Sequence, residues 1–335
     1  MKNILKISSV FVGTVIGAGF ATGAELVQYY VRFGRVSLWA LIASCVLFGV
    51  LCAVVLCKIY WAGAVNFESY FKEFDRPLLI KIFGYIITIF MFACFCIMLA
   101  ASGAAFKEQL GLPYWSGVAV LCVICSAAFI AGAKGLVAIN TVITPVMLTG
   151  IVFLGIYVFF NSHVPVFATE KFIDNIAFSS LVYISYNSLA LIVVMTAVHE
   201  YVDSRKTALC AAALGGGVLC VGAVILWLIL FNFNVTTSEI PILSILKSVG
   251  GIGRTVYFPV LYIAIITTAL ANGFGVAQSF GVNIKVTGVL ISIAGALVSY
   301  AGFSTLIVTA YGFFGWIGIP VIFITLFDGV KYLKY

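Results

Sequence analysis

The sequence predicts an all-α integral membrane protein with about ten transmembrane helices and almost no soluble part. Hydrophobic residues make up 64% of the 335 positions, and charged residues make up only 9%. A soluble domain carries about a quarter charged residues, which it needs to cover its surface. The chain is also long enough for ten spans of about 20 residues each, joined by short loops. Lipid must therefore solvate much of the surface.

Apolar runs between charged or turn-rich segments define the expected spans. The first run contains glycines and Glu25 and is too long for a cleavable signal peptide, so we expect it to remain as a membrane span. Within the break at 232–253, residues 240–249 are expected to form a short surface helix. In chain order the spans cover 7–31, 36–60, 79–106, 114–132, 136–160, 175–200, 207–231, 254–280, 285–302 and 304–327.

Lysine and arginine are distributed unevenly between the two sets of loops. With the N-terminus inside, twelve of the 18 basic residues fall on the inner side of the membrane. Basic residues favour the cytoplasmic side, so both termini are predicted to be cytoplasmic. The net charge of +7 therefore reflects topology, because the basic residues form no run or motif typical of nucleic-acid binding.

Nothing in the sequence is typical of an enzyme. Cys122 and Cys125 have CxxC spacing, but no second pair or nearby histidine completes a zinc set, and all nine cysteines lie in apolar stretches. His199 and Glu200 lack the HExxH pattern of metalloproteases. No nucleotide motif, paired intramembrane carboxylates or serine–histidine set is present. We therefore expect no catalysis and no cofactor other than a coupling ion.

Two predicted spans carry interruptions at matching positions. The first contains four glycines within eleven residues, a composition that disfavours a continuous helix. The sixth carries the polar and aromatic segment 181–188. An alternative is that the glycines only allow neighbouring helices to pack closely. This would explain glycines in any span, but not interruptions in two spans that lie five apart. The pairing predicts a 5+5 inverted repeat, over 1–161 and 162–335, in which helices 1 and 6 are broken near 17–22 and 183–187.

The motifs in these two spans resemble those of a known family. The string VGTVIGAGFATGAE at 12–25, together with YISYN at 183–187, resembles the bacterial YkvI-like membrane proteins. Those proteins are grouped in the amino acid–polyamine–organocation superfamily, which has the LeuT-type fold. The resemblance implies a secondary active transporter of a small solute, such as an amino acid, in a bacterial inner membrane. The implied partners are this solute and the lipid bilayer.

The resemblance also implies a sodium site between the first and eighth spans. In sodium-coupled relatives, carbonyls of the first helix face small or hydroxyl residues at i, i+3 and i+4 of the eighth. Sodium is a hard cation that prefers oxygen ligands, and an unwound helix frees carbonyl oxygens. The alternative is that the threonines only bond carbonyls of their own helix. The matching positions are Gly13, Ile16, Ala264, Thr267 and Thr268.

A solute site is implied in the middle of the bilayer, between the two interrupted spans. A half-helix N-terminus favours a carboxylate and freed carbonyls suit an ammonium, so a zwitterion would fit. The alternative is that the aromatic side chains only pack against their neighbours and that Asn187 only joins two helices. The implied site consists of the amides of Ala18, Gly19, Phe20 and Ala21 and of the groups of Tyr183, Ser185, Tyr186 and Asn187.

Glu25 is the carboxylate that lies well inside a predicted span, and two roles remain open for it. An intramembrane charge is costly and indicates a functional group, such as a proton-coupling residue. Alternatively, Thr22 and Glu25 have the spacing of a helix capping box. The leading expectation is therefore a sodium-coupled transporter. The alternatives are a proton-coupled transporter that uses Glu25, or a membrane sensor that binds a solute without moving it.

Overall fold

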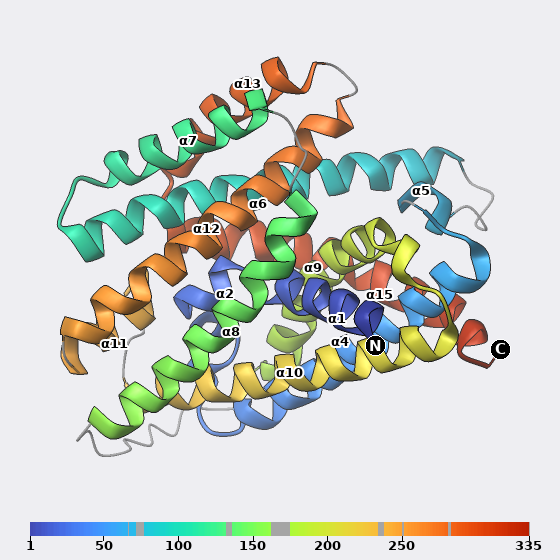
Figure 1. The fold of residues 1–335 in the computed structure, drawn as a ribbon, viewed down its shortest axis with the longest axis horizontal. Helices are drawn as coiled ribbons and strands as arrows, with labels where there is room; N and C mark the ends of the chain where they lie inside the picture. The colour runs from blue at the N-terminus through green and yellow to red at the C-terminus, as the bar shows by residue number, and fades with distance from the viewer. Residues whose placement is uncertain are drawn as a thin grey trace.

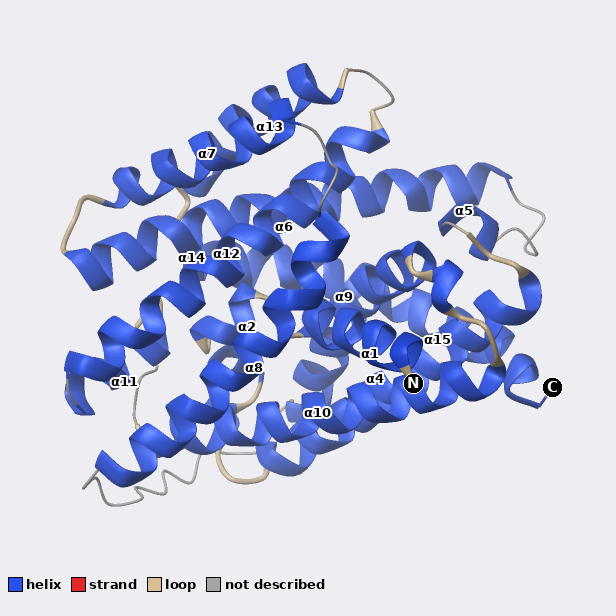
Figure 2. Cartoon of the chain, in the orientation of Figure 1, coloured by secondary structure: helices blue, strands red, loops and turns tan. Residues whose placement is uncertain are grey.

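The computed structural model describes residues 1–65, 67–71, 77–131, 136–161, 175–233, 238–249, 251–280 and 283–334. Helices dominate this part of the chain, and no strand occurs in it (Figure 2). Within these described ranges, seven helices are each long and apolar enough to cross a membrane on their own. The divided first span, α8 and the shorter α13 complete the ten expected spans.

The observed elements follow the predicted spans closely. The first span is divided into α1 (Lys2–Val15), α2 (Ala18–Thr22) and α3 (Ala24–Tyr29), and the last into α14 (Phe303–Leu306), η4 (Ile307–Tyr311) and α15 (Gly312–Lys334). Short connecting elements are η1 (Val31–Phe33), α5 (Phe67–Tyr70), η3 (His199–Tyr201) and the expected surface helix, α11 (Pro241–Val249). The other spans are α4 (Ser37–Ala62), α6 (Pro77–Leu110), α7 (Tyr114–Ala131), α8 (Leu136–Asn161), α9 (Ile176–Ala197), α10 (Arg205–Asn232), α12 (Gly251–Ser279) and α13 (Ile284–Ser299).

Helices that occupy the same position in the order of each predicted half pack against each other. The second helices, α4 and α10, form one such pair, the third helices α6 and α12 another, and the fourth helices α7 and α13 a third. Figure 1 shows α7 with α13 at one edge and α4 with α10 at the opposite edge. This arrangement supports the division at 161/162, which stays a prediction.

Small residues allow these helices to approach closely. A Cβ atom on Gly216 of α10 would lie only 3.2 Å from the Cα atom of Gly49 on α4. On α7, a Cβ atom on Gly117 would overlap the carbonyl of Ser102 on α6. Lipid tails are as apolar as the side chains, so close contact of this kind, rather than water exclusion, holds membrane helices together.

The connecting elements mark the two ends of the helical bundle. In Figure 1, α5 and the C-terminus lie at one end, with the N-terminus toward it, and α11 lies at the other. The loops that contain α5 and α11 therefore emerge on opposite sides, as the ten-span topology requires. That the α5 end faces the cytoplasm remains a prediction from the lysine and arginine distribution.

A buried ion pair connects α4 to the last span at the α5 end. The Lys58 ammonium contacts the Asp328 carboxylate although Lys58 is only 1% exposed, and Lys331 lies 2.7 Å from the other oxygen of Asp328. The Lys58 nitrogen also lies 4.5 Å from the ring centre of Tyr70 on α5. This cluster therefore joins α4, α5 and α15.

The prediction that the sixth span is broken near 183–187 is wrong, because α9 is continuous from Ile176 to Ala197. Short polar side chains of this segment bond the preceding turn, and the helix does not unwind. The hydroxyl of Ser185 donates to the carbonyl of Leu181, and the amide of Asn187 donates to that of Tyr183. Unlike the first span, α9 contains no glycine or proline. Side chains that bond the preceding turn do not interrupt a helix.

Candidate functional site

The first span is broken where the glycine-rich motif predicts, although the break is narrower than expected. Helix α1 ends at Val15, Ile16 adopts φ −82° and ψ 68°, and Gly17 is extended. The helix resumes at Ala18, so most of the predicted interval 17–22 is helical. A second interruption follows at Gly23, whose φ of 81° is left-handed and favours glycine.

The break leaves backbone groups available in the interior of the protein. A helix end leaves its last four carbonyls and first four amides without partners in the helix. Before the break, the amide of Ile16 donates to the carbonyl of Val12 at 2.7 Å, and after it the amide of Ala21 donates to the carbonyl of Gly17 at 3.0 Å. The remaining carbonyls at the end of α1 and the first amides of α2 are the groups that a ligand can use.

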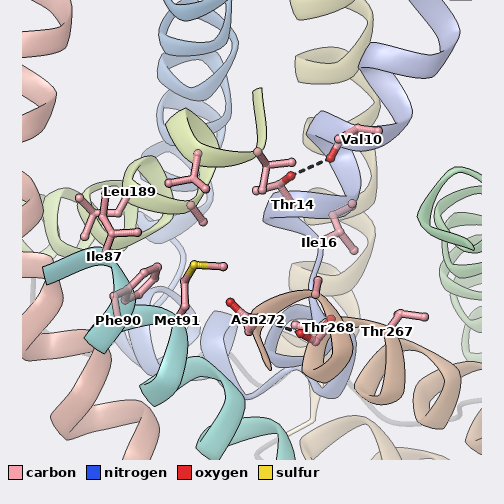
Figure 3. A pocket seen from close by; sticks show the side chains of 15 residues that line it. Val10, Thr14, Ile16, Ile87, Phe90, Met91, Leu189, Thr267, Thr268 and Asn272 are labelled. Atoms are coloured by element: carbon pink, nitrogen blue, oxygen red, sulfur yellow. Dashed lines mark hydrogen bonds between the residues drawn. The ribbon is translucent and has the colours of Figure 1, made fainter. Parts of the chain in front are cut away.

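A cavity of about 120 Å³ lies beside the end of α1, between α1, α6, α9 and α12 (Figure 3). Four of the five residues of the implied sodium site line it, which brings the two distant segments together as expected. They are Gly13, Ile16, Thr267 and Thr268. The fifth, Ala264, is fully buried one turn earlier on α12.

The two threonines of this cavity differ in their hydrogen bonds. The hydroxyl of Thr267 donates to the carbonyls of Ile263 at 3.0 Å and Ala264 at 3.1 Å, as the structural alternative supposed. This interaction uses the hydroxyl proton of Thr267 and leaves the lone pairs of its oxygen able to bind a cation. Among the described residues, Thr268 has no side-chain hydrogen bond, and a Cβ atom on Gly17 would lie 3.8 Å from its Oγ1. Thr268 therefore faces the break directly.

Two further polar side chains line the cavity and were missed from the sequence. Thr14 donates its hydroxyl to the carbonyl of Val10 at 2.8 Å, and Asn272 donates its amide to the carbonyl of Thr268 at 2.9 Å (Figure 3). Their oxygens remain free to accept. The signal for Asn272 was its spacing, because residues four apart on a helix share a face. The cavity has room for a cation that keeps some of its water.

The residues expected to bind the solute are only partly brought together. Tyr183 and Tyr186 lie with Tyr29 of α3 in one aromatic cluster, with ring centres 5.6–5.7 Å apart. Ser185 instead contacts α15, where a Cβ atom on Gly318 would lie 3.1 Å from its Cβ atom. On the α2 side, Ala18 and Phe20 are buried, and the carbonyl of Ala21 accepts a bond from Tyr257 at 2.9 Å.

Glu25 lies between the aromatic cluster of Tyr29, Tyr183 and Tyr186 and the short helix α2. Its side chain folds back over Gly23 onto α2, where a Cβ atom on Gly19 would overlap its carboxyl group. The phenol groups of Tyr186 and Tyr311 interact with this carboxyl, and their rings stack with centres 4.3 Å apart. Glu25 is only 5% exposed. The carboxyl thus occupies the region where the solute carboxylate was expected.

The capping-box interpretation of Glu25 is wrong. The N-cap residue of α3 is Gly23 rather than Thr22, so Glu25 is the second rather than the third residue of this helix. The oxygen of Thr22 accepts a bond from the amide of Ala24 at 3.3 Å, and its hydroxyl donates to the carbonyl of Gly19 at 2.8 Å. The left-handed turn at Gly23 shifts the register that a capping box requires.

Two curated proteins are similar to the chain over nearly its whole length. It is 27% identical to the uncharacterized membrane protein YkvI of Bacillus subtilis (strain 168), across 95% of this chain and 93% of that protein. It is 22% identical to the uncharacterized protein YyaD of the same organism, across 93% and 92% respectively. No model of a known protein family matches. The resemblance to the YkvI-like proteins is thus confirmed.

Solved transporter structures share the fold. Mhp1, a nucleobase-cation-symport-1 family transporter with bromovinylhydantoin bound, superposes with a TM-score of 0.57 at 14% identity, over 94% of this chain and 77% of that one. A manganese transporter mutant of Eremococcus coleocola superposes with a TM-score of 0.57 at 10% identity, over 98% and 78%. The chain therefore has the LeuT-type fold predicted for it.

Proposed function

We propose that the chain is a secondary active transporter that moves a small organic solute across a bacterial inner membrane by alternating access, coupled to sodium. The observation that carries this proposal is the convergence of Gly13, Ile16, Thr267 and Thr268 on one cavity beside the broken first span. The transporters of similar fold support the general class, and the solute and the coupling ion are inferred from the site. We expect the solute to carry an ammonium group, as amino acids and other zwitterions do.

The chemistry of the cavity favours a monovalent cation. The oxygens available are hydroxyls, an amide and backbone carbonyls, all of them neutral, and the described residues that line the cavity include no carboxylate or histidine. Hard divalent cations are held mainly by carboxylates, whose charge compensates for dehydration. Sodium carries less charge and is also a hard cation, so a neutral set of oxygens suits it better.

A cation in this position would connect two helices that belong to different parts of the fold. Its ligands come from the end of α1 and from α12, which are joined here by few direct bonds between described residues. Binding would therefore stabilise the arrangement in which α1 lies against α12. A ligand shifts a conformational equilibrium by its difference in affinity for the two states, which is what coupling requires.

Glu25 supports a second candidate, a proton-coupled transporter. It is a buried carboxyl group next to the solute region, and no basic side chain of the described residues forms an ion pair with it. Proton uptake would remove its charge and the cost of burying it. The same residue would serve a sensor that binds a solute without moving it, so binding alone does not separate these functions.

Sodium dependence of thermal stability tests the proposal. We expect the purified protein to unfold at a higher temperature in sodium chloride than in potassium or choline chloride of equal ionic strength. A ligand at 100 times its dissociation constant stabilises the native state by about 2.7 kcal/mol. Equal unfolding temperatures in the three salts, together with a response to pH, would instead favour proton coupling through Glu25.

A further inference from the structure

A carboxyl group buried among tyrosines lacks a charged partner in the described part of the chain. Glu25 is 5% exposed, the phenols of Tyr186 and Tyr311 face its carboxyl, and it forms no ion pair with another described residue. The hydroxyls of Tyr183 and Tyr186 are also buried without a hydrogen-bond partner in the described part of the chain. Buried polar groups are almost always paired, and clusters that are not indicate a missing ligand or water.

The groups around Glu25 would suit a cation. Four tyrosine rings pack against one another here, with the centres of neighbouring rings between 4.3 and 5.7 Å apart. They belong to Tyr29, Tyr183, Tyr186 and Tyr311. Aromatic faces attract ammonium groups, most strongly where water is excluded. The groups that face the carboxyl from α3, α6, α9 and η4 are phenols and the thiol of Cys94, so no cation among the residues that the structure describes competes for it.

The cluster adjoins the cavity beside the break. On α6 the cavity is lined by Phe90 and Met91, and Cys94, which interacts with Glu25, follows one turn later. On α9 it is lined by Leu189 and Ala190, and Tyr186 precedes them by one turn. A solute that enters the cavity is therefore one helical turn from the Glu25 carboxyl group.

We propose that Glu25 is the counterion for the ammonium group of the transported solute, and that the substrate class is an organic amine without a carboxylate rather than an amino acid. The carboxyl lies against Gly19, in the segment whose free amides would otherwise receive a solute carboxylate. A second carboxylate there would meet a like charge in a dry environment. Glu25 thus replaces the acidic group that an amino acid would bring. This inference rests on the proposed transport function.

Matched pairs of amines and amino acids test the substrate class. Phenethylamine and phenylalanine, cadaverine and lysine, and agmatine and arginine differ by one carboxylate each. We expect the amines to raise the unfolding temperature of the wild-type protein in sodium chloride at neutral pH, and the amino acids to leave it unchanged. Binding of the amino acids as tightly as the amines, or binding of neither member of any pair at saturating concentrations, would overturn the inference.

Two variants locate the effect at the carboxyl. Glu25→Gln keeps the size of the side chain and should weaken amine binding about 100-fold, as expected when one partner of a buried charge pair is removed. Gly19→Ala should also weaken it, because its methyl group would overlap the carboxyl, whereas Gly84→Ala has open space around the new Cβ atom and serves as the control. Unchanged amine affinity in Glu25→Gln would contradict the proposal.

Sodium measured in the same samples separates this inference from the proposed function. A retained sodium shift in Glu25→Gln shows that the variant is folded and that the cation site is intact. Sodium stabilisation without any amine response overturns the amine assignment and leaves the transporter proposal standing. A stability change with pH that disappears in Glu25→Gln, without amine binding, identifies Glu25 as a proton site and also overturns the assignment.

Discussion

Replacing both hydroxyls of the cation site, in the variant Thr267→Ala with Thr268→Ala, should abolish the sodium-dependent rise in unfolding temperature. The change removes two oxygens from a small set of neutral ligands and leaves the α1 carbonyls in place. The loss of sodium affinity should be on the order of a few kcal/mol, and solute binding should weaken only through its coupling to sodium. Differential scanning fluorimetry in sodium and potassium chloride measures the effect.

The single variants and a matched control sharpen this test. Thr268→Ala should have the larger effect, because the hydroxyl of Thr267 already bonds two carbonyls of its own helix. Thr149→Ala removes a hydroxyl that makes the same kind of bond, to the carbonyl of Pro145, away from the cavity. The control should keep the full sodium response. A double variant that also keeps it would show that sodium binds elsewhere or not at all.

Breaking the buried ion pair at the α5 end should produce the largest loss of stability. Lys58→Met leaves the Asp328 carboxylate without its buried partner, at a cost of about 3 kcal/mol, the lower end of the range for such pairs because Asp328 keeps Lys331 and some exposure. Adding Asp328→Leu should recover much of the loss, since both charges are then gone. Unfolding in detergent measures the three free energies.

Lys331→Met is the matched control for this pair. Its side chain is half exposed, so its contact with Asp328 should contribute below about 1 kcal/mol. A Lys58→Met variant no less stable than Lys331→Met would contradict the account of the buried pair. A double variant as unstable as Lys58→Met would show that Lys58 acts through its contact with Tyr70 instead.

The spans were predictable because lipid imposes a simple requirement on composition. A helix that faces lipid must be apolar over about 20 residues, so charged and turn-rich segments mark where it ends. Even the surface helix α11 was visible as a short amphipathic segment at 240–249. The break in the first span was also predictable from composition. Glycine has a low helix propensity, so four glycines within eleven residues disfavour a continuous helix.

The sixth span shows where this reasoning failed. The segment around Tyr183 and Asn187 is polar, but short polar side chains bond the preceding turn and leave the helix intact. The absence of glycine and proline from α9 was the informative signal. Polarity in a membrane helix indicates groups that need partners, and only glycine or proline indicates that the backbone itself is free to open.

The position of Glu25 depends on features that no sequence pattern specified. The left-handed turn at Gly23 redirects the side chain onto Gly19, and the partners of the carboxyl come from α9 and η4, more than 150 residues away. Likewise, Thr14 and Asn272 meet at the cation cavity only because the fold brings α1 and α12 to its two sides. The sequence indicated which residues were unusual, and tertiary contacts determined which of them meet.

Solute flux in proteoliposomes tests the central claim most directly. The protein is reconstituted and loaded with potassium, and uptake of a labelled amine that stabilises it is followed after dilution into sodium or potassium. The account predicts accumulation only with an inward sodium gradient, its collapse when sodium is equalised, and its loss in the double threonine variant. Uptake that follows a pH gradient equally well without sodium, or amine binding with no uptake under any gradient, would contradict it.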